Sequence, residues 1–442
     1  MTPIPTSTIR ALGLRCFAAA CVLTLSACGG GGGGGEGTVA PPVPAPAPTP
    51  VPTPTPTPSP GDFGGTVLSN VARSGVSGVW GYTAPDGSRY AIMGTDKGVA
   101  VFDLRDTRNV RVVAEIDGPT NTSKPGIYWR EMRVYGQHAY IVSEHTNVRG
   151  GIMIVDLSGL PASVRFVKSV VPRDGSLKAH TVDIDTARGL LYLQRNTNLA
   201  APAPAPLPSP LYDKPGATSG GSIAGTRSAH GDPGKGEHHE AAPTQGSIDI
   251  YDIKTDPENP RYLTTFNQNR AVHDMTAVGN FVYVAEGDAN SFSIWNVSNP
   301  ALPALVVRWQ VAPGNYAHNI WPSGDGTFVV TTEEVPFGLP ARVWRLNGSA
   351  PPTELSSFKV GSGTPHNVIM EGNMAYLSHY TEGAAVVDLS NPSSPKVTLR
   401  VDTNAQTGSG LSGCWGVYKF PGVPLMMCSD ISTGFHLIGI TP

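Results

Sequence analysis

The chain has 442 residues, of which 15% are charged, and it contains 52 glycines and 42 prolines. Its formal net charge is -3 at pH 7. A charge this close to zero gives no electrostatic reason to expect nucleic acid or an anionic membrane surface as a partner. The length alone allows two or three domains, and the abundance of Gly and Pro predicts many turns together with linker sequence.

Residues 1–28 predict an export signal. Arg10 and Arg15 precede an apolar stretch that ends at Leu25 and is too short to span a bilayer. The sequence Leu25-Ser26-Ala27-Cys28 resembles the bacterial lipoprotein cleavage box, so we expect Cys28 to be lipidated; an ordinary signal peptide cut nearby is the alternative. Gly29 follows instead of Asp, and resemblance to lipoprotein sorting in Gram-negative bacteria then implies the outer membrane, on either its periplasmic or its surface side.

Residues 29–64 predict a disordered tether. Gly29 to Gly35 form a flexible run, and from Val43 to Pro60 proline alternates with alanine and threonine, a composition that favours extended polyproline conformation. The membrane would therefore be reached through the lipid anchor alone.

From residue 65 to residue 442, a pattern of four short strands recurs seven times, and it is clearest between His366 and Pro392. Each copy opens with a pair of residues: Trp80-Gly81, Arg130-Glu131, His180-Thr181, His273-Asp274, His318-Asn319, His366-Asn367 and Trp415-Gly416. Successive pairs start 45 to 50 residues apart, except for one interval of 93. Repeats of this length with four strands each indicate propeller blades. We predict an all-β, seven-bladed β-propeller of four-stranded antiparallel blades.

The last copy has only three strands, which end near Ile440. An isolated strand-like piece lies at Gly65 to Ser74, before the first copy, with Thr66 to Ala72 as its predicted strand. Because ring closure pairs edges that an open array would expose, we predict that this N-terminal strand completes the last blade.

The long interval contains an insertion at about residues 196–245, in the third copy. It is rich in Pro and then in polar residues, including His230, His238 and His239. We predict a disordered loop. A loosely spaced metal site is the alternative reading of its His and Glu residues.

Two cysteines, Cys414 and Cys428, belong to the folded part and flank a hairpin around Pro421-Gly422. Their midpoint is residue 421, so they should face each other across the ladder, and an exported protein favours a disulfide. Two free buried thiols are the alternative.

Propeller topology predicts where chemistry would take place. The first strand of each blade lines the channel, and the opening pairs share one face of the ring with the ends of the second strands. The channel mouth should gather the candidate ligand-binding residues His180, His273, His318, His366, Arg130, Glu131, Asp274, Trp80 and Trp415. A second circle at the ends of the second strands should contain Glu144, Glu286, Glu333 with its neighbour Glu334, and His379. Imidazoles and carboxylates of this kind suit a small polar or anionic ligand, a divalent metal ion or general acid–base chemistry.

The repetition of these residues also has a structural explanation. In WD-repeat propellers, which this chain resembles in architecture, a histidine in the same kind of loop hydrogen-bonds within its blade. Trp80 and Trp415 are more typical of packing between blades than of ligand stacking. The chain contains no Gly-x-Ser-x-Gly elbow and no phosphate-binding Gly loop, so catalysis is the less favoured reading.

The blade ends, such as Val386-Val387-Asp388-Leu389 followed by Ser-Asn-Pro, resemble the LVIVD repeat. The order of motifs is similar to that of bacterial choice-of-anchor B surface proteins, with the stretches Trp80 to Gly94, Trp129 to Glu144 and Trp415 to Ile431 carrying the likeness. This resemblance implies a secreted or surface-anchored propeller and transfers no catalytic residue.

We therefore expect a monomeric, membrane-anchored extracytoplasmic module that binds a protein, a glycan or a small ligand through its histidine-lined face. The alternatives are a metal-dependent hydrolase or lyase with its site at the channel mouth, and a purely structural or adhesive surface protein.

Overall fold

The structure is a computed structural model, and it describes residues 64–120, 129–144, 146–195, 246–267, 270–312 and 315–441. The predicted signal peptide, Cys28, the tether up to residue 63 and the insertion at 196–245 lie outside the described residues. Within the described ranges every regular element is a β-strand, and the strands form seven four-stranded antiparallel sheets. No helix in this part of the chain is long and apolar enough to cross a membrane.

Each sheet is one blade, and the blades are numbered here in chain order. Blade 1 consists of β2 (Val79–Thr83), β3 (Arg89–Gly94), β4 (Gly98–Asp103) and β5 (Arg111–Asp117). Blade 2 consists of β6 (Arg130–Tyr135), β7 (His138–Ser143), β8 (Ile152–Asp156) and β9 (Arg165–Val170). Blade 3 consists of β10 (Val182–Asp185), β11 (Leu190–Arg195), β12 (Ser247–Asp252) and β13 (Arg261–Phe266). Blade 4 consists of β14 (Asp274–Val278), β15 (Phe281–Ala285), β16 (Ser291–Asn296) and β17 (Ala304–Gln310). Blade 5 consists of β18 (Ala317–Pro322), β19 (Phe328–Glu333), β20 (Ala341–Asn347) and β21 (Ala350–Phe358). Blade 6 consists of β22 (Val368–Glu371), β23 (Met374–Ser378), β24 (Ala384–Asp388) and β25 (Lys396–Val401). Blade 7 consists of β26 (Cys414–Lys419), β27 (Leu425–Asp430), β28 (Gly434–Thr441) and β1 (Gly64–Val71).

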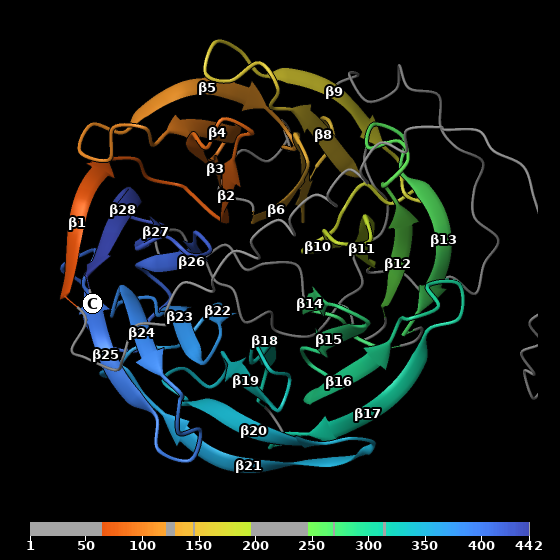
Figure 1. The fold of residues 1–442 in the computed structure, drawn as a ribbon, viewed down its shortest axis with the longest axis vertical. Helices are drawn as coiled ribbons and strands as arrows, with labels where there is room; N and C mark the ends of the chain where they lie inside the picture. Colours follow the sequence, from red (N-terminus) through yellow and green to blue (C-terminus); the bar gives the residue numbers. More distant parts are fainter. Residues whose placement is uncertain are drawn as a thin grey trace, which may run out of the picture. The chain divides into compact units, whose positions relative to one another are not determined.

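The blades form a closed ring around a central axis (Figure 1). The first strand of each blade lies nearest the axis, and the last strand lies at the rim (Figure 1). The first strands are β2, β6, β10, β14, β18, β22 and β26, and the last strand of blade 7 is β1. The burial of the strands follows from this order: β4 is buried throughout, whereas most residues of β5 are at least partly exposed. The predicted seven-bladed propeller is therefore confirmed.

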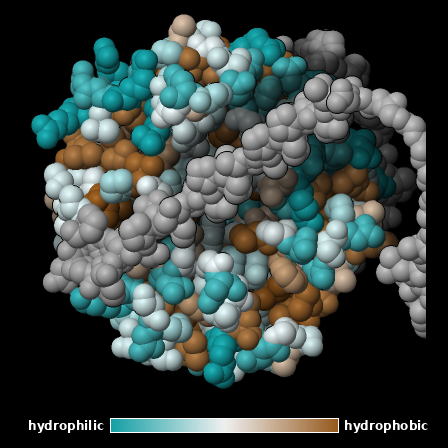
Figure 2. All heavy atoms as spheres, in the orientation of Figure 1, coloured by the Kyte–Doolittle hydropathy of each residue, from teal (hydrophilic) through white to brown (hydrophobic). Residues whose placement is uncertain are grey.

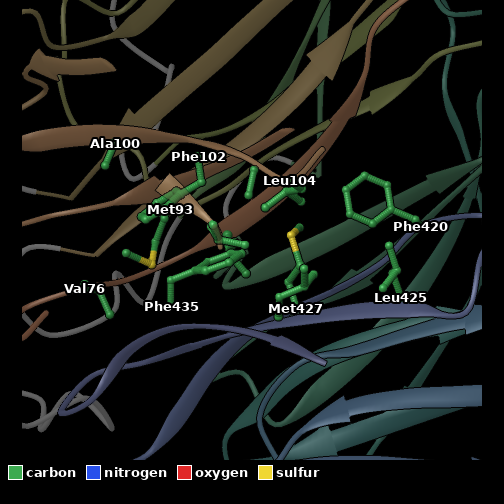
Figure 3. Packing of buried hydrophobic residues seen from close by; sticks show 13 residues of the cluster. Val76, Met93, Ala100, Phe102, Leu104, Phe420, Leu425, Met427 and Phe435 are labelled. Carbon is green, nitrogen blue, oxygen red and sulfur yellow. The ribbon is translucent and has the colours of Figure 1, made fainter. Parts of the chain in front are cut away.

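Apolar side chains of neighbouring blades pack against each other. Between blades 1 and 7, the rings of Phe102 and Phe435 stack with centroids 4.6 Å apart, and Met93 and Met427 belong to the same cluster (Figure 3). Because a middle strand contacts a neighbouring blade on either side, its side chains are apolar in both directions, as in the sequence Val-Ala-Val-Phe of β4. The described residues thus form one apolar cluster at each of the seven interfaces between neighbouring blades.

The N-terminal strand closes the ring as predicted. β1 pairs antiparallel with β28, from Gly64 opposite Thr441 to Val71 opposite Phe435, and the strand begins and ends slightly earlier than the predicted Thr66 to Ala72. The first and last described strands of the chain therefore lie side by side in blade 7.

The two cysteines meet, although the predicted ladder does not bring them together. Cys428 pairs with Val417, and Cys414 pairs with Asp430 beyond an irregularity in β26. The turn lies farther along the chain than Pro421, so the register is shifted from the expected one. The sulfur atoms of Cys414 and Cys428 are 2.07 Å apart and the Cα atoms 5.8 Å apart.

The outer surface is mixed in character, with hydrophilic residues spread around the rim and apolar residues between them (Figure 2). The most exposed large apolar side chain in the described part is that of Leu302, at 75%. Single apolar side chains of this kind are ordinary on soluble surfaces and do not by themselves mark a binding site.

Candidate functional site

Four histidines and one tryptophan form a continuous row at one end of the channel. Consecutive ring centroids lie 4.3 Å apart from His180 to His273, 4.3 Å from His273 to His318, 4.1 Å from His318 to His366 and 4.7 Å from His366 to Trp415. These residues occupy the opening positions of blades 3 to 7, and we refer to the five of them as the histidine arc. None has more than 6% of its surface exposed. The ring closure thus gathers residues that are spread over 236 positions of the chain, from 180 to 415.

Backbone carbonyls fix the orientation of two of the imidazoles. His273 Nδ1 donates to the backbone oxygen of His318 at 2.8 Å, and His366 Nδ1 donates to that of Trp415 at 2.6 Å. Because a carbonyl oxygen can only accept, Nδ1 carries the proton in both residues, and the lone pair of the neutral ring is then on Nε2. This is the tautomer in which metal-binding histidines are commonly held.

Two acids contact the arc. Glu144 Oε1 lies 2.5 Å from His180 Nδ1, at one end. Glu334 lies beside the middle, with Oε2 4.0 Å from His318 Nε2 and Oε1 3.9 Å from His366 Nε2. Glu334 follows β19, so it belongs to the connection between the second and third strands of blade 5. The arrangement places nitrogen and oxygen donors around a common space.

Burial controls the protonation of the arc. It lowers the pKa of His273 to about 3, helped by the nearby His180, and it lowers the pKa of His366 well below its usual value. Burial also acts on His180, but the Glu144 carboxylate outweighs it and the pKa of His180 is raised. Burial raises the pKa of Glu334 to about 8. At neutral pH His273 and His366 are therefore neutral, and at one end of the arc Glu144 favours the protonated form of His180.

Tyr380 holds the central acid in place. Its hydroxyl donates to Glu334 Oε1 at 2.5 Å, and its ring contacts that of His366 with centroids 4.8 Å apart. Its φ is +37°, a conformation that is unfavourable for a bulky residue. Two backbone hydrogen bonds with Cys414 hold it there, from Tyr380 N at 3.1 Å and from Cys414 N at 3.0 Å. Backbone strain at a side chain of defined contacts is typical of functional sites.

A second polar layer lies next to the arc, on the residues that follow it in the first strands. Asp274 accepts from Thr181 Oγ1 at 2.8 Å and from Asn319 Nδ2 at 2.6 Å, and Asn319 Oδ1 in turn accepts from Val368 N at 3.2 Å. Arg133 donates to Asp183 at 2.6 Å and to Glu131 at 3.2 Å. These contacts join neighbouring blades. A narrow pocket at this level is lined by Trp80, Glu131, Arg133, Asp274, Asn319, Trp321 and Asn367, among others.

The structure displaces one predicted mouth residue, Trp80, from the opening position of its blade. In the strand register, Trp80 of blade 1 is equivalent to Ile369 of blade 6, because Trp80 pairs with Ile92 as Ile369 pairs with Tyr376. Ile369 comes three residues after His366. The residue of blade 1 that is equivalent to His366 is therefore Ser77, not Trp80. The Trp80 ring instead faces the guanidinium of Arg133, 4.0 Å from its centroid, and the edge of Tyr418. Arg130 occupies the opening position in blade 2, where it is fully buried, and its Nε donates to the backbone oxygen of Pro119 at 2.8 Å.

Most of the predicted second circle has structural partners away from the arc. Glu286 is bound by Arg308 at 2.9 Å and by Ser293 at 2.8 Å, and Glu333 by Arg342 at 2.7 Å. His379 is buried, and burial lowers its pKa to about 4. Of this circle, Glu144 contacts the arc, and so does Glu334, the neighbour of Glu333.

Sequence reasoning left Tyr380 out of the candidate set and named Glu334 only as the neighbour of Glu333. Each directly follows a residue of the second circle, Glu333 and His379. Strand alternation offered a signal, since neighbouring residues at a strand end face opposite sides. When Glu333 turns toward Arg342, Glu334 is the one that turns to the arc.

Comparisons with known proteins agree with this architecture. Residues 269–311 and 362–403 match the family model of the LVIVD repeat, and they contain blades 4 and 6. The chain carries LVIVD repeats. A comparison with curated proteins by sequence finds no match. Among solved structures, Raptor from Chaetomium thermophilum is similar, with a TM-score of 0.53 and 10% identity over 85% of this chain and 29% of that chain. The chain thus spans less than a third of that protein, and the likeness indicates the fold alone.

Proposed function

We propose that this protein is an extracytoplasmic binding module, anchored to the membrane through Cys28 and residues 29–64, which binds a small polar solute or ion at the histidine arc. The observation that carries the proposal is the convergence of four imidazoles with the carboxylates of Glu144 and Glu334. A propeller that carries LVIVD repeats fits a binding or structural module of the cell surface.

The burial of the arc favours a small ligand over a macromolecule. Side chains with 6% or less of their surface exposed offer a protein or glycan almost no contact area. A solute bound beside Glu334 meets imidazole nitrogens, a carboxyl group and the phenol of Tyr380, which together recognise a polar or charged group.

The rest of the proposal follows from the sequence. The cleavage box at Cys28, with Gly29 after it, supports a lipoprotein of the outer membrane, and the choice-of-anchor B resemblance supports the same class. Export supports a disulfide between Cys414 and Cys428 in the mature protein. We propose that one chain is the functional unit, because the ring closes within the chain.

A structural role of the arc is the second candidate, and one observation favours it. The Nδ1 bonds of His273 and His366 to backbone oxygens join each blade to the next, as a residue repeated for stability would do. The two roles predict different responses to solutes, because a ligand that binds the folded state raises its stability in proportion to RT ln(1 + [L]/Kd).

Thermal unfolding of the purified full-length protein against a panel of small solutes tests the binding proposal. The panel contains inorganic anions, sugars, amines and metal ions. We expect one class to raise the Tm of the wild type and to leave the Tm of His318→Phe and His366→Phe unchanged. His138 is a partly buried histidine outside the arc, and His138→Phe should respond as the wild type does. A panel without any selective response contradicts binding and leaves the structural role.

Membrane fractionation tests the anchor separately. The wild type should sediment with the outer membrane. The variant Cys28→Ser cannot carry the lipid, so it should not sediment with the outer membrane, whether or not it is exported. Sedimentation of Cys28→Ser with the outer membrane would refute the lipid anchor.

A further inference from the structure

Three donor groups in the middle of the histidine arc lie in the arrangement of a metal site. They are Nε2 of His318, Nε2 of His366 and the carboxylate of Glu334, and their ligand atoms all lie within 4.8 Å of one another. Nitrogen and oxygen ligands of a tetrahedral ion, at about 2.0–2.2 Å from it, lie about 3.3–3.6 Å apart. Glu334 Oε2 lies 4.0 Å from His318 Nε2 and Glu334 Oε1 lies 3.9 Å from His366 Nε2, so one carboxyl oxygen is directed to each imidazole at a separation about half an ångström longer than this.

The backbone of all three groups is held by the sheets. His318 lies within β18, Glu334 directly follows β19 and donates from its backbone N to Tyr316 O at 3.1 Å, and His366 N donates to Ser378 O at 3.0 Å. The donors thus come from two neighbouring blades whose mutual position is fixed by packing. A metal site needs such fixed geometry.

The groups behind the donors have the chemistry of supporting ligands. The Nδ1 bond from His366 to Trp415 O leaves Nε2 as the basic atom of the neutral ring, and the Tyr380 hydroxyl orients Glu334 from the other side. The strained φ of Tyr380, +37°, is an independent sign that its position is retained against a conformational cost.

We propose that the histidine arc binds one divalent transition-metal ion of the Zn²⁺ class through His318, Glu334 and His366. This inference rests on the proposed function, because it names the ligand of the same site. Two imidazoles and one carboxylate suit Zn²⁺, Ni²⁺ or Cu²⁺, whereas Mg²⁺ and Ca²⁺ prefer oxygen ligands throughout. Three protein ligands leave a fourth position of a tetrahedral ion to water or to a solute from outside.

Metal content and Zn²⁺ titration of the purified full-length protein test the inference. After metal removal with a chelator, Zn²⁺ should bind at about one ion per chain, and a large excess of Mg²⁺ or Ca²⁺ should not displace it. His366→Phe and the nearly isosteric Glu334→Gln should each weaken Zn²⁺ binding about a hundredfold or more, and Tyr380→Phe about tenfold. Co²⁺ in place of Zn²⁺ should give the visible absorption bands of a tetrahedral site in the wild type and lose them in Glu334→Gln.

The insertion provides the matched control, because it contains three histidines and clustered histidines are common metal ligands in proteins. A variant with His230, His238 and His239 replaced by Ala should keep the single ion. Loss of the ion in this variant, with retention in Glu334→Gln and His366→Phe, would overturn the inference. If no metal binds but another solute stabilises the protein through the arc, the metal inference fails and the binding function stands. If no solute binds at all, both fail.

Discussion

His366 Nδ1 lies 2.6 Å from the backbone oxygen of Trp415, the residue that occupies the same position in the next blade. His273 makes the same contact with His318 at 2.8 Å. Each of these bonds joins the first strand of one blade to that of its neighbour. The arc therefore stabilises the inner wall of the ring, whichever ligand it binds.

The substitution His273→Phe tests this stabilising role. Phenylalanine keeps an aromatic ring beside His180 and His318 but cannot donate to His318 O, so the free energy of unfolding should fall by about 1–3 kcal/mol. Urea unfolding measures the change. His138→Phe is the control, since His138 is half-buried and its pairing with Glu258, at 3.5 Å, is worth less than about 1 kcal/mol. Equal effects of the two substitutions would contradict the role of the Nδ1 bond.

The closing strand should be essential for a cooperative fold. A chain that lacks residues 64–72 leaves β28 with an unpaired edge and removes Leu68 and Val71 from the cluster between blades 1 and 7. The two side chains alone contribute about 3 kcal/mol or more, and the open edge favours aggregation. Thermal unfolding and gel filtration measure both effects. A deletion of residues 36–60, within the predicted tether, should leave the Tm unchanged; a stable, monomeric chain without β1 would refute the closure argument.

The pairing of Cys414 with Cys428 should contribute to stability in the oxidised protein. They are separated by 14 positions, and closing a loop of this size in the unfolded chain stabilises the fold by about 3 kcal/mol in the chain-entropy description. Cys428→Ala should lose about that amount, and a reductant should then have no further effect. Thiol titration of the denatured mature protein should find no free thiol, since Cys16 and Cys21 leave with the signal and Cys28 is lipidated. One or more free thiols would contradict this combination.

The repeat could be predicted from sequence because each blade has the same pattern of polar and apolar residues. A polar opening residue, an apolar second strand and a Val-Asp-Leu ending are visible in blade 6 and recur with little change. The period fixes the number of blades, and the incomplete last copy fixes the need for a closing strand. These features depend on local sequence and on the requirement that no sheet edge stays open.

The details of the channel could not be predicted in the same way. Trp80 lies one average period before Arg130, but the strand register of blade 1 puts Ser77 at the opening position. Glu334 and Tyr380 meet only because loops from two blades converge, and neither has a partner near it in sequence. The cysteine hairpin was misjudged because its turn includes more residues after Pro421 than before it. Register and loop path depend on packing between blades, which the sequence pattern does not specify.

The buried carboxyl group of Glu131 should make stability depend on pH. Burial raises the pKa of Glu131 to about 7. The positive charge of Arg133 lowers this pKa, the nearby Asp274 raises it and His180 lowers it. Arg133 donates hydrogen bonds both to Glu131 and to Asp183. The usual pKa of Glu131 is 4.5. Because the folded state holds the proton more tightly than the unfolded state, the contribution of Glu131 is fully present below about pH 4.5 and is lost as pH rises through about 7, by up to about 3 kcal/mol.

Glu131→Gln isolates this contribution, since glutamine resembles the protonated carboxyl group and does not titrate. The difference in unfolding free energy between the wild type and this variant should shift in favour of the variant as the pH increases from 5 to 8, and the loss of the bond to Arg133 adds a constant offset. Urea unfolding at several pH values measures the difference. A difference that is flat over this range would show that Arg133 keeps Glu131 ionised in the folded protein, as in an ordinary buried ion pair.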